Sequence, residues 1–272
     1  MTAKIHLLLI DPQNDFVKTP AREGSLAVPG GHEDCVRMAQ FVAKHGKVLD
    51  DIHVTLDSHR TIDVAHPYWW VNEAGQHPDP YTVITPSSLA KKEWMTRIPY
   101  PSKLGLTPES YVQRLEDTGR YPLCIWPEHC RIGGDGNNVH PDLFEALTDW
   151  EHRRYRFVDY VTKGSNPYTE HYSAVRAEVP IPTDPSTMMN TPLIDMLKSC
   201  DKIIVAGEAL SHCLANTLRD IGSEFGEENI RKFILLRDCT SNVPGFEKRG
   251  DDFLQEFIAK GMEVTTSVDF QL

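Results

Sequence analysis

The sequence of 272 residues predicts an α/β protein, organised as a three-layer α/β/α sandwich with a central, mostly parallel sheet. Two observations predict this fold class. Short apolar runs alternate along the chain with longer amphipathic stretches, as strands and helices do. The apolar runs are nearly continuous, which is typical of parallel strands that are covered on both faces.

Each expected strand is an apolar run that ends at a polar residue or a glycine. The expected strands cover residues 6–10, 52–56, 157–161, 202–206, 233–236 and 263–266. The stretch 33–45 has apolar residues at helical spacing, from Val36 and Ala39 to Val42 and Ala43. Helices are also expected over 213–221 and 253–260. Because strands and helices alternate, we expect right-handed crossovers between parallel strands.

Residues 67–122 interrupt this alternation and are rich in Pro, Tyr and Trp. We interpret residues 1–272 as a single domain in which 67–122 form an insertion over the face that carries the site. Exposed aromatic side chains of this insertion could support a homo-oligomer.

The net charge of −11 and the absence of a basic cluster argue against a nucleic-acid partner. No stretch approaches the roughly 18 apolar residues of a membrane span, and the apolar run 5–10 is too short for a signal peptide. The six cysteines have no CxxC spacing, which argues against a zinc knuckle or a disulfide framework. We therefore expect a cytoplasmic protein with a small-molecule partner.

Ionisable side chains follow several of the expected strands, and three of them suit a cysteine hydrolase. Cys213 begins an expected helix, where the helix dipole favours a thiolate. Asp11 could accept the thiol proton, and Lys163 could stabilise the thiolate and a developing oxyanion. Taken singly, Cys213 reads more simply as a core cysteine and Lys163 as a surface lysine, and Asp11 reads equally well as a capping or loop carboxylate. Their common position at strand ends favours a catalytic set, because ligands of parallel sheets bind there.

A second group of residues could bind a metal. Asp57 and His59 are two residues apart on an extended segment, and His129 lies in the sequence Trp-Pro-Glu-His-Cys. His66 and His77 are further candidates. Any single histidine here reads more simply as a loop residue bonded to the backbone. As a set, a carboxylate with imidazoles suits Zn, Fe or Mn.

Five motifs together resemble one known family. They are Asp-Pro-Gln-Asn-Asp-Phe at 11–16, Asp-Ser-His at 57–59, Trp-Pro-Glu-His-Cys at 126–130, Lys-Gly at 163–164 and Gly-Glu-Ala-Leu-Ser-His-Cys at 207–213. Their order is that of the isochorismatase-like cysteine hydrolases, and the two metal elements resemble the nicotinamidase (pyrazinamidase) branch. Glu208 and Ser211 depart from the usual nucleophile loop, and the interval between His59 and Trp126 is longer than in compact nicotinamidases.

The resemblance implies a role for each matching position. By this resemblance Asp11, Lys163 and Cys213 are the catalytic residues, and the amides of Ala209 and Cys213 form the oxyanion hole. Asp57, His59 and His129 match the ligands of one divalent metal ion, with Zn favoured over Fe or Mn, and His66 is our choice for a fourth ligand over His77. Phe16 and Trp126 match aromatic residues that sandwich the substrate ring. The Glu208–Ala209 bond matches the family's non-proline cis peptide.

The implied function is hydrolysis of nicotinamide, or of a closely related heteroaromatic amide, to the carboxylic acid and ammonia through a thioester. Such a reaction belongs to pyridine nucleotide metabolism or to pyridine catabolism. Two alternatives stay open. One is an isochorismatase-like hydrolase that acts on another amide, a carbamoyl compound or a vinyl ether. The other is a non-catalytic binding protein on the same fold, since fold alone does not prove activity.

Overall fold

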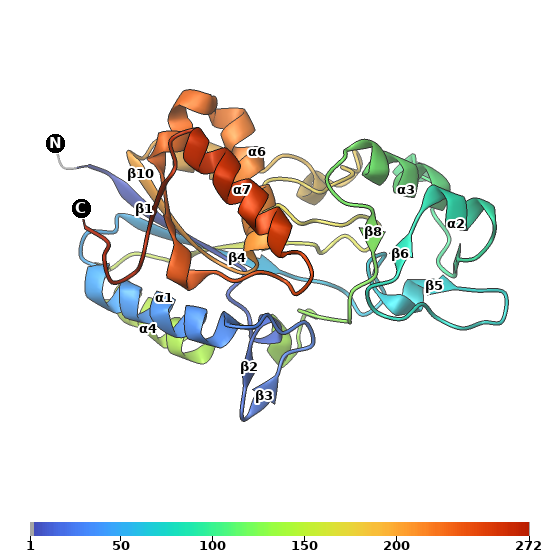
Figure 1. Ribbon diagram of the computed structural model, residues 1–272, viewed down its shortest axis with the longest axis horizontal. Coiled ribbons are helices and arrows are strands. Elements are labelled where there is room, and N and C mark those ends of the chain that lie inside the picture. Colours follow the sequence, from blue (N-terminus) through green and yellow to red (C-terminus); the bar gives the residue numbers. More distant parts are fainter. Residues whose placement is uncertain (1–2, 272) are drawn as a thin grey trace.

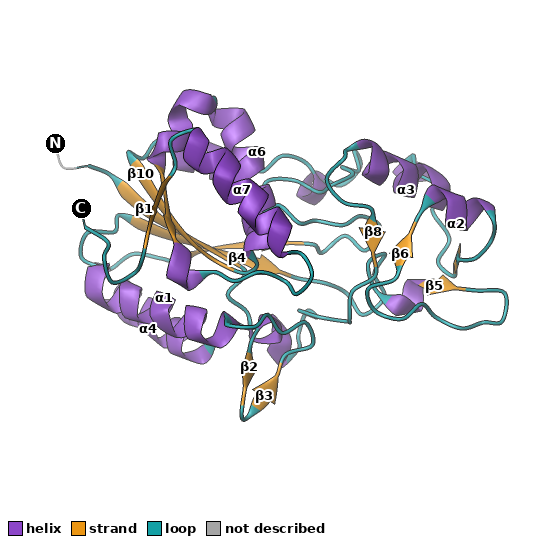
Figure 2. Ribbon diagram, in the orientation of Figure 1, coloured by secondary structure: helices purple, strands orange, loops and turns teal. Residues whose placement is uncertain are grey.

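The computed structural model describes residues 3–271, which are built around one six-stranded sheet (Figures 1 and 2). Every neighbouring pair of strands in it runs parallel, so the expected parallel sheet is confirmed. From edge to edge the strands are β12 (Glu263–Thr265), β11 (Phe233–Leu236), β10 (Lys202–Gly207), β1 (Ile5–Ile10), β4 (Asp51–Asp57) and β9 (Asp159–Lys163).

Helices cover both faces of the sheet and complete the three layers (Figure 1). One face carries α1 (Gly31–His45) and α4 (Pro141–Arg154), and the other carries α5 (Thr191–Lys198), α6 (Ala215–Phe225) and α7 (Glu247–Ala259). In β1, Leu7 and Leu9 pack in the core under α1 and α4, whereas Leu8 and Ile10 pack in the core under α5, α6 and α7. Because both faces are buried, β1 is apolar at every position except His6.

The order of the strands reverses between β1 and β10. The chain adds β4 and then β9 on one side of β1, and later adds β10, β11 and β12 on the other side. In open parallel sheets, ligands bind beyond the carboxyl ends of the strands at such a reversal. The register pairs Ile10 with Gly207 and Asp57 with Lys163, so the functional strand ends stand at one level.

The segment 67–122 lies beyond the end of the sheet toward which the strands run (Figure 1). It contains β5 (Trp70–Val71), β6 (Val83–Ile84), α2 (Pro86–Ala90), β7 (Met95–Thr96) and α3 (Pro108–Asp117), and β8 (Leu123–Cys124) follows it. Trp69, Trp70 and Tyr111 are fully buried in an apolar cluster of this region. Its description as an insertion within one domain stays a prediction. A further hairpin, β2 (Lys18–Thr19) with β3 (Arg22–Glu23), follows β1.

Several element boundaries differ from the sequence expectation. The strand expected at 157–161 is β9, two residues later, because Phe157 is 90% exposed and does not join the sheet. The helix expected at 213 begins earlier as a π-helical turn, Leu210–Leu214, and continues as α6. Helix α7 begins six residues before the expected 253, at Glu247. Helices α4 and α5 occupy stretches in which no element was expected.

None of the helices between residues 3 and 271 combines the length and the apolar character that a membrane crossing requires.

Candidate active site and metal centre

Lys163, the last residue of β9, lies at the centre of a buried ionic cluster. Its Nζ is 3.0 Å from Asp11 Oδ2, at the end of β1, and 2.9 Å from Asp57 Oδ1, at the end of β4. It is also 3.6 Å from Cys213 Sγ. The carbonyl of His171 accepts a further hydrogen bond from Nζ at 3.0 Å. Four neighbouring strands thus bring the three predicted catalytic side chains together.

Burial and mutual attraction set the protonation of this cluster. Burial alone would lower the pKa of Lys163, but the carboxylates of Asp11 and Asp57 raise that pKa well above its ordinary value. Burial raises the pKa of Asp11, partly offset by Lys163. Burial also raises the pKa of Cys213 well above its ordinary value, although Lys163 opposes this. Burial therefore opposes the thiolate that the helix position of Cys213 favours.

The first motif supplies positioning contacts as well as Asp11. The side-chain amide of Gln13 donates to the carbonyl of Asp57 at 2.7 Å, and its oxygen accepts from the amide of Asp57 at 2.7 Å. Asp15 Oδ2 accepts from the backbone amide of Cys130 at 2.6 Å. Gln13 and Asp15 thus connect the end of β1 to the two metal motifs, which contain Asp57 and Cys130.

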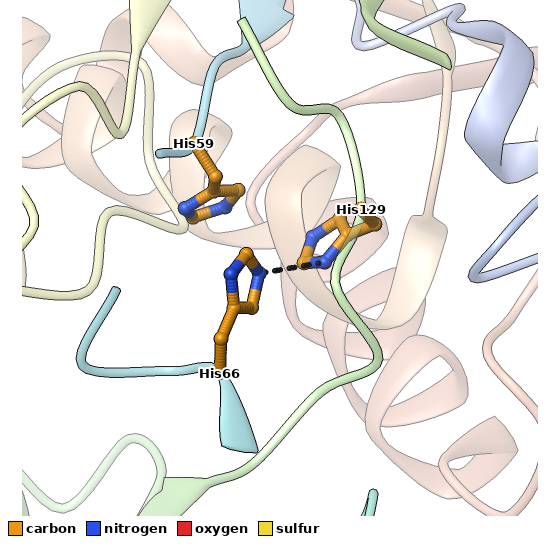
Figure 3. A group of neighbouring side chains, drawn as sticks. All are labelled: His59, His66 and His129. Atoms are coloured by element: carbon orange, nitrogen blue, oxygen red, sulfur yellow. Dashed lines mark hydrogen bonds between the residues drawn. The ribbon is translucent and has the colours of Figure 1, made fainter. Parts of the chain in front are cut away.

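Three buried histidines face one another next to this cluster (Figure 3). Ligand atoms of His59, His66 and His129 all lie within 4.8 Å of one another. Asp57 Oδ2 is 3.0 Å from His59 Nε2 and 3.2 Å from His129 Nε2. The structure therefore brings all four predicted ligand side chains together.

The donor set fits a divalent metal ion. Three imidazoles and one carboxylate are ligands that Zn, Fe and Mn accept in proteins. Burial lowers the pKa of His66 to about 2, whereas Asp57 and Asp63 outweigh burial and raise the pKa of His59 well above its ordinary value. Asp63 Oδ2, 3.3 Å from His59 Nδ1, is placed to orient that ring. His77 lies apart from this group: its Nδ1 bonds the carbonyl of Trp70 at 2.7 Å, and its ring packs on Tyr68.

A small cavity joins the two groups. About 390 Å³ of empty space, partly open to solvent, lies between them. Phe16, Trp126 and Ala209 line it together with Cys213 and His129. Both predicted aromatic residues and both residues of the predicted oxyanion hole thus line one cavity. The peptide bond between Glu208 and Ala209 is cis, as the resemblance implied.

The segment 67–122 was expected over this face, but among the described residues none of its members lines the cavity. It acts on the site indirectly. Tyr81 packs edge-on against Trp126 with ring centroids 6.0 Å apart, and the hydroxyl of Tyr121 donates to the carbonyl of Ser211 at 2.6 Å.

Sequence reasoning missed several residues of the cavity wall. Glu170, His171 and Tyr172 follow Lys163 within one loop, and His212 directly precedes Cys213. Burial raises the pKa of Glu170 to about 7 and lowers the pKa of His171 to about 3. The only available signal was their proximity in sequence to Lys163 and Cys213, which does not show where a loop side chain points.

Comparison with known proteins bears on this fold and site. No family model matches the chain. The nicotinamidase of Escherichia coli (strain K12) is 26% identical over 219 residues, which cover 79% of this chain and 74% of that protein. The structure of the yeast nicotinamidase Pnc1p matches with a TM-score of 0.63 and 19% identity, over 96% of this chain and 99% of that one. A pyrazinamidase of Pyrococcus horikoshii in complex with zinc matches with a TM-score of 0.54 and 16% identity, over 97% and 99% of the two chains.

The fold is therefore the one seen in solved nicotinamidase and pyrazinamidase structures. The resemblance to the nicotinamidases that the motifs indicated is confirmed by the similarity to the Escherichia coli protein.

Proposed function

We propose that the protein is a metal-containing cysteine amidohydrolase, which converts nicotinamide or a closely related heteroaromatic amide to the carboxylic acid and ammonia. One observation carries the proposal. A single buried ammonium group, Lys163 Nζ, contacts Asp11 and lies 3.6 Å from Cys213 Sγ, in a cavity that His129 of the histidine cluster also lines. The yeast nicotinamidase has also been solved with the inhibitor nicotinaldehyde bound, and it shares this fold at 19% identity.

In the first half-reaction, Asp11 accepts the proton of the Cys213 thiol, and the thiolate attacks the carboxamide carbon. The backbone amides of Ala209 and Cys213 hold the developing oxyanion, and Lys163 adds positive charge nearby. Asp11 then gives its proton to the leaving nitrogen. The C–N bond breaks, ammonia leaves, and the acyl group remains on sulfur as a thioester.

In the second half-reaction, water attacks the thioester carbon and Asp11 takes a proton from that water. The C–S bond breaks, the acid leaves, and the thiol regains its proton. When bound by Asp57, His59, His66 and His129, a divalent cation would supply a Lewis acid for the ring nitrogen of the substrate. Phe16 and Trp126 would hold the ring between their faces. We propose Zn as the ion, because the donor set suits it and a relative of this fold binds it.

Ammonia release from nicotinamide by the purified, metal-analysed protein tests the activity. Cys213→Ala should abolish turnover, whereas Cys200→Ala, which alters a buried free cysteine outside the cavity, should retain it. Substantial turnover by Cys213→Ala would refute the mechanism. A folded, metal-loaded wild type that releases no ammonia would refute nicotinamide as the substrate.

Metal content tests the second part of the proposal. His66→Ala should bind at least tenfold less tightly to Zn than the wild type does, because it loses one of four ligands. His77→Ala is the matched control, since His77 lies outside the cluster. Equal Zn content in the two variants would remove His66 from the ligand set.

A further inference from the structure

The nucleophile loop contains a buried acid that the mechanism above does not use. Glu208 is one of the two departures from the usual loop sequence, and its side chain is 0% exposed. It is not among the described residues that line the cavity, so it does not contact the substrate. Its peptide bond to Ala209, however, contains one of the two amides of the proposed oxyanion hole. The side chain of Glu208 can therefore affect the reaction through the position of that amide.

Two hydrogen bonds to Ser241 hold the backbone on either side of Ala209. The backbone amide of Ser241 donates to Glu208 Oε2 at 3.4 Å, and the carbonyl of Ser241 accepts from the amide of Leu210 at 2.8 Å. The amide of Glu208 donates to the carbonyl of Ile10 at 2.7 Å. The peptide unit that bears the Ala209 N–H group is therefore fixed between the end of β1 and the segment that follows β11.

Helix α1 holds Ser241 in turn. The hydroxyl of Ser241 donates to Asp34 Oδ2 at 2.6 Å, and Arg37 Nη2 donates to Asp34 Oδ1 at 2.7 Å. The carboxyl group of Glu208 also lies against this helix, because a Cβ at Gly31 would be 3.7 Å from Glu208 Oε1. A buried polar network thus joins α1, the segment after β11 and the nucleophile loop.

The protonation of Glu208 fits this network. Burial and then the carboxylate of Asp34 raise the pKa of Glu208 well above its ordinary value, so its carboxyl group is neutral. A neutral carboxyl group has an oxygen that accepts and a hydroxyl that donates. Oε2 accepts from Ser241, and Oε1 has no donor in reach among residues 3–271, which matches an oxygen that bears the proton. An aliphatic side chain at 208 would leave the Ser241 amide without an acceptor in the described part of the chain.

We propose that Glu208 is a positioning residue of the oxyanion hole, whose carboxyl group binds the Ser241 amide and thereby holds the Ala209 N–H group in place for the developing oxyanion. The oxyanion forms only when Cys213 attacks. Loss of this contact should therefore weaken the tetrahedral state and leave binding of the planar ring unchanged. The inference rests on the proposed function, because that function assigns the oxyanion hole.

Nicotinaldehyde and 3-methylpyridine distinguish these two kinds of binding. Both contain the pyridine ring, but only the aldehyde reacts with the Cys213 thiol. A C–S bond then forms, the π bond of the C=O group breaks, Asp11 takes the thiol proton and the carbonyl oxygen becomes the oxyanion. Titration calorimetry of the metal-loaded protein gives the dissociation constant of each compound, and their ratio is the preference for the aldehyde. In Glu208→Leu this preference should fall about tenfold, less than the roughly 100-fold that removal of such a donor costs.

Glu208→Gln is the conservative variant. Its amide supplies one acceptor and one donor at the same place, so the preference should stay within about twofold of the wild type. Asp50→Ala is the matched control, because it removes a carboxylate that accepts from the backbone amide of Ile5 at 2.8 Å, at the opposite end of β1. It should lower the free energy of unfolding and leave the preference unchanged.

A preference in Glu208→Leu within about twofold of the wild type would overturn the inference, and so would an equal loss in Glu208→Gln or in Asp50→Ala. If Glu208→Leu does not fold, Ser241→Ala replaces it. Loss of the bond between Ser241 Oγ and Asp34 should lower the preference severalfold, and a wild-type preference would then overturn the inference. A wild type without a Cys213-dependent preference for the aldehyde would instead refute the proposed function, so the two failures are distinguishable.

Discussion

Replacing Lys163 by methionine should destabilise the protein far more than replacing an exposed lysine would. Methionine keeps most of the length and apolar volume of the side chain but removes the ammonium group. In the native protein that group is 1% exposed and contacts two carboxylates, Asp11 and Asp57, at 3.0 and 2.9 Å. The variant therefore leaves two buried negative charges without the cation between them.

Loss of the ammonium group costs the two carboxylates different amounts of free energy. Asp57 keeps His59 and His129 at 3.0 and 3.2 Å, whereas Asp11 keeps two uncharged side-chain donors, the hydroxyl of Thr55 and the thiol of Cys213. Removing one partner of a buried ion pair costs about 3–5 kcal/mol. We expect a loss of that size in the free energy of unfolding, and we assign most of it to Asp11.

Urea unfolding, followed by circular dichroism with chelator and again with Zn, measures this loss. The double variant Asp11→Asn with Lys163→Met should regain at least about half of it, because a neutral amide then faces the methionine. An exposed control, Lys248→Met, removes a surface ion pair and should change the free energy by about 1 kcal/mol or less. If Lys163→Met costs no more than Lys248→Met, or if the double variant is no more stable than the single one, the electrostatic account of this cluster is wrong.

Three further outcomes follow from single positions. Gly164 has φ +80°, and a Cβ there would lie 2.9 Å from Asp57 Oδ1. Gly164→Ala should therefore weaken Zn binding at least tenfold in a chelator competition. Unchanged affinity would contradict the proposed ligand set. Gly207 has φ +118°, and a Cβ there would lie 2.0 Å from the carbonyl oxygen of Ile10. Gly207→Ala should therefore lower the free energy of unfolding by about 3 kcal/mol or more, as measured by thermal unfolding. A wild-type Tm would show that β1 and β10 can separate freely. Burial raises the pKa of Glu178 from 4.5 to about 7. Between these two pH values the folded state binds more protons than the unfolded state. The free energy of unfolding therefore falls as the pH rises from 4.5 to 7, by up to about 3 kcal/mol. Glu178→Gln should show a smaller fall when Tm is followed from pH 5 to 8, because the share of Glu170, whose pKa burial also raises to about 7, remains. A parallel pH dependence in both proteins would exclude Glu178 as a cause.

The six strands could be predicted from the sequence because each is an apolar run buried against helices. Helices α4 and α5 could not: α4 buries only three of its 14 residues, Leu143, Leu147 and Trp150, and α5 has only eight residues. The edge strand β9 was misplaced by two residues for a related reason: Phe157 is apolar but exposed, and a strand with only one neighbour gives a weaker pattern than β1 does. Apolar residues predict burial only where tertiary packing provides it.

The candidate site shows the same limit. Residues at strand ends could be placed together, because the carboxyl ends of parallel strands share one edge. The side chains that hold them could not, because their partners are distant in sequence. Gln13 bonds Asp57, which lies 44 positions away in the sequence, and Asp15 bonds Cys130, which lies 115 positions away. The wall residue His212 is adjacent to Cys213, yet only the packing of Tyr121 and Phe246 shows which way its ring faces.

The arrangement of charges links the two halves of the site. Lys163 bridges Asp11, the proposed base, and Asp57, the proposed metal ligand, so the two carboxylates share one cation. A divalent cation at the histidines would attract the carboxylate of Asp57, so Lys163 would interact more strongly with Asp11. The pKa of Asp11 would then be lower, so Asp11 would be a weaker base toward the Cys213 thiol than in the metal-free protein. In the proposed mechanism a metal would therefore act through the shared lysine as well as through the substrate ring, and the stability of Lys163→Met with and without Zn measures the coupling through the lysine.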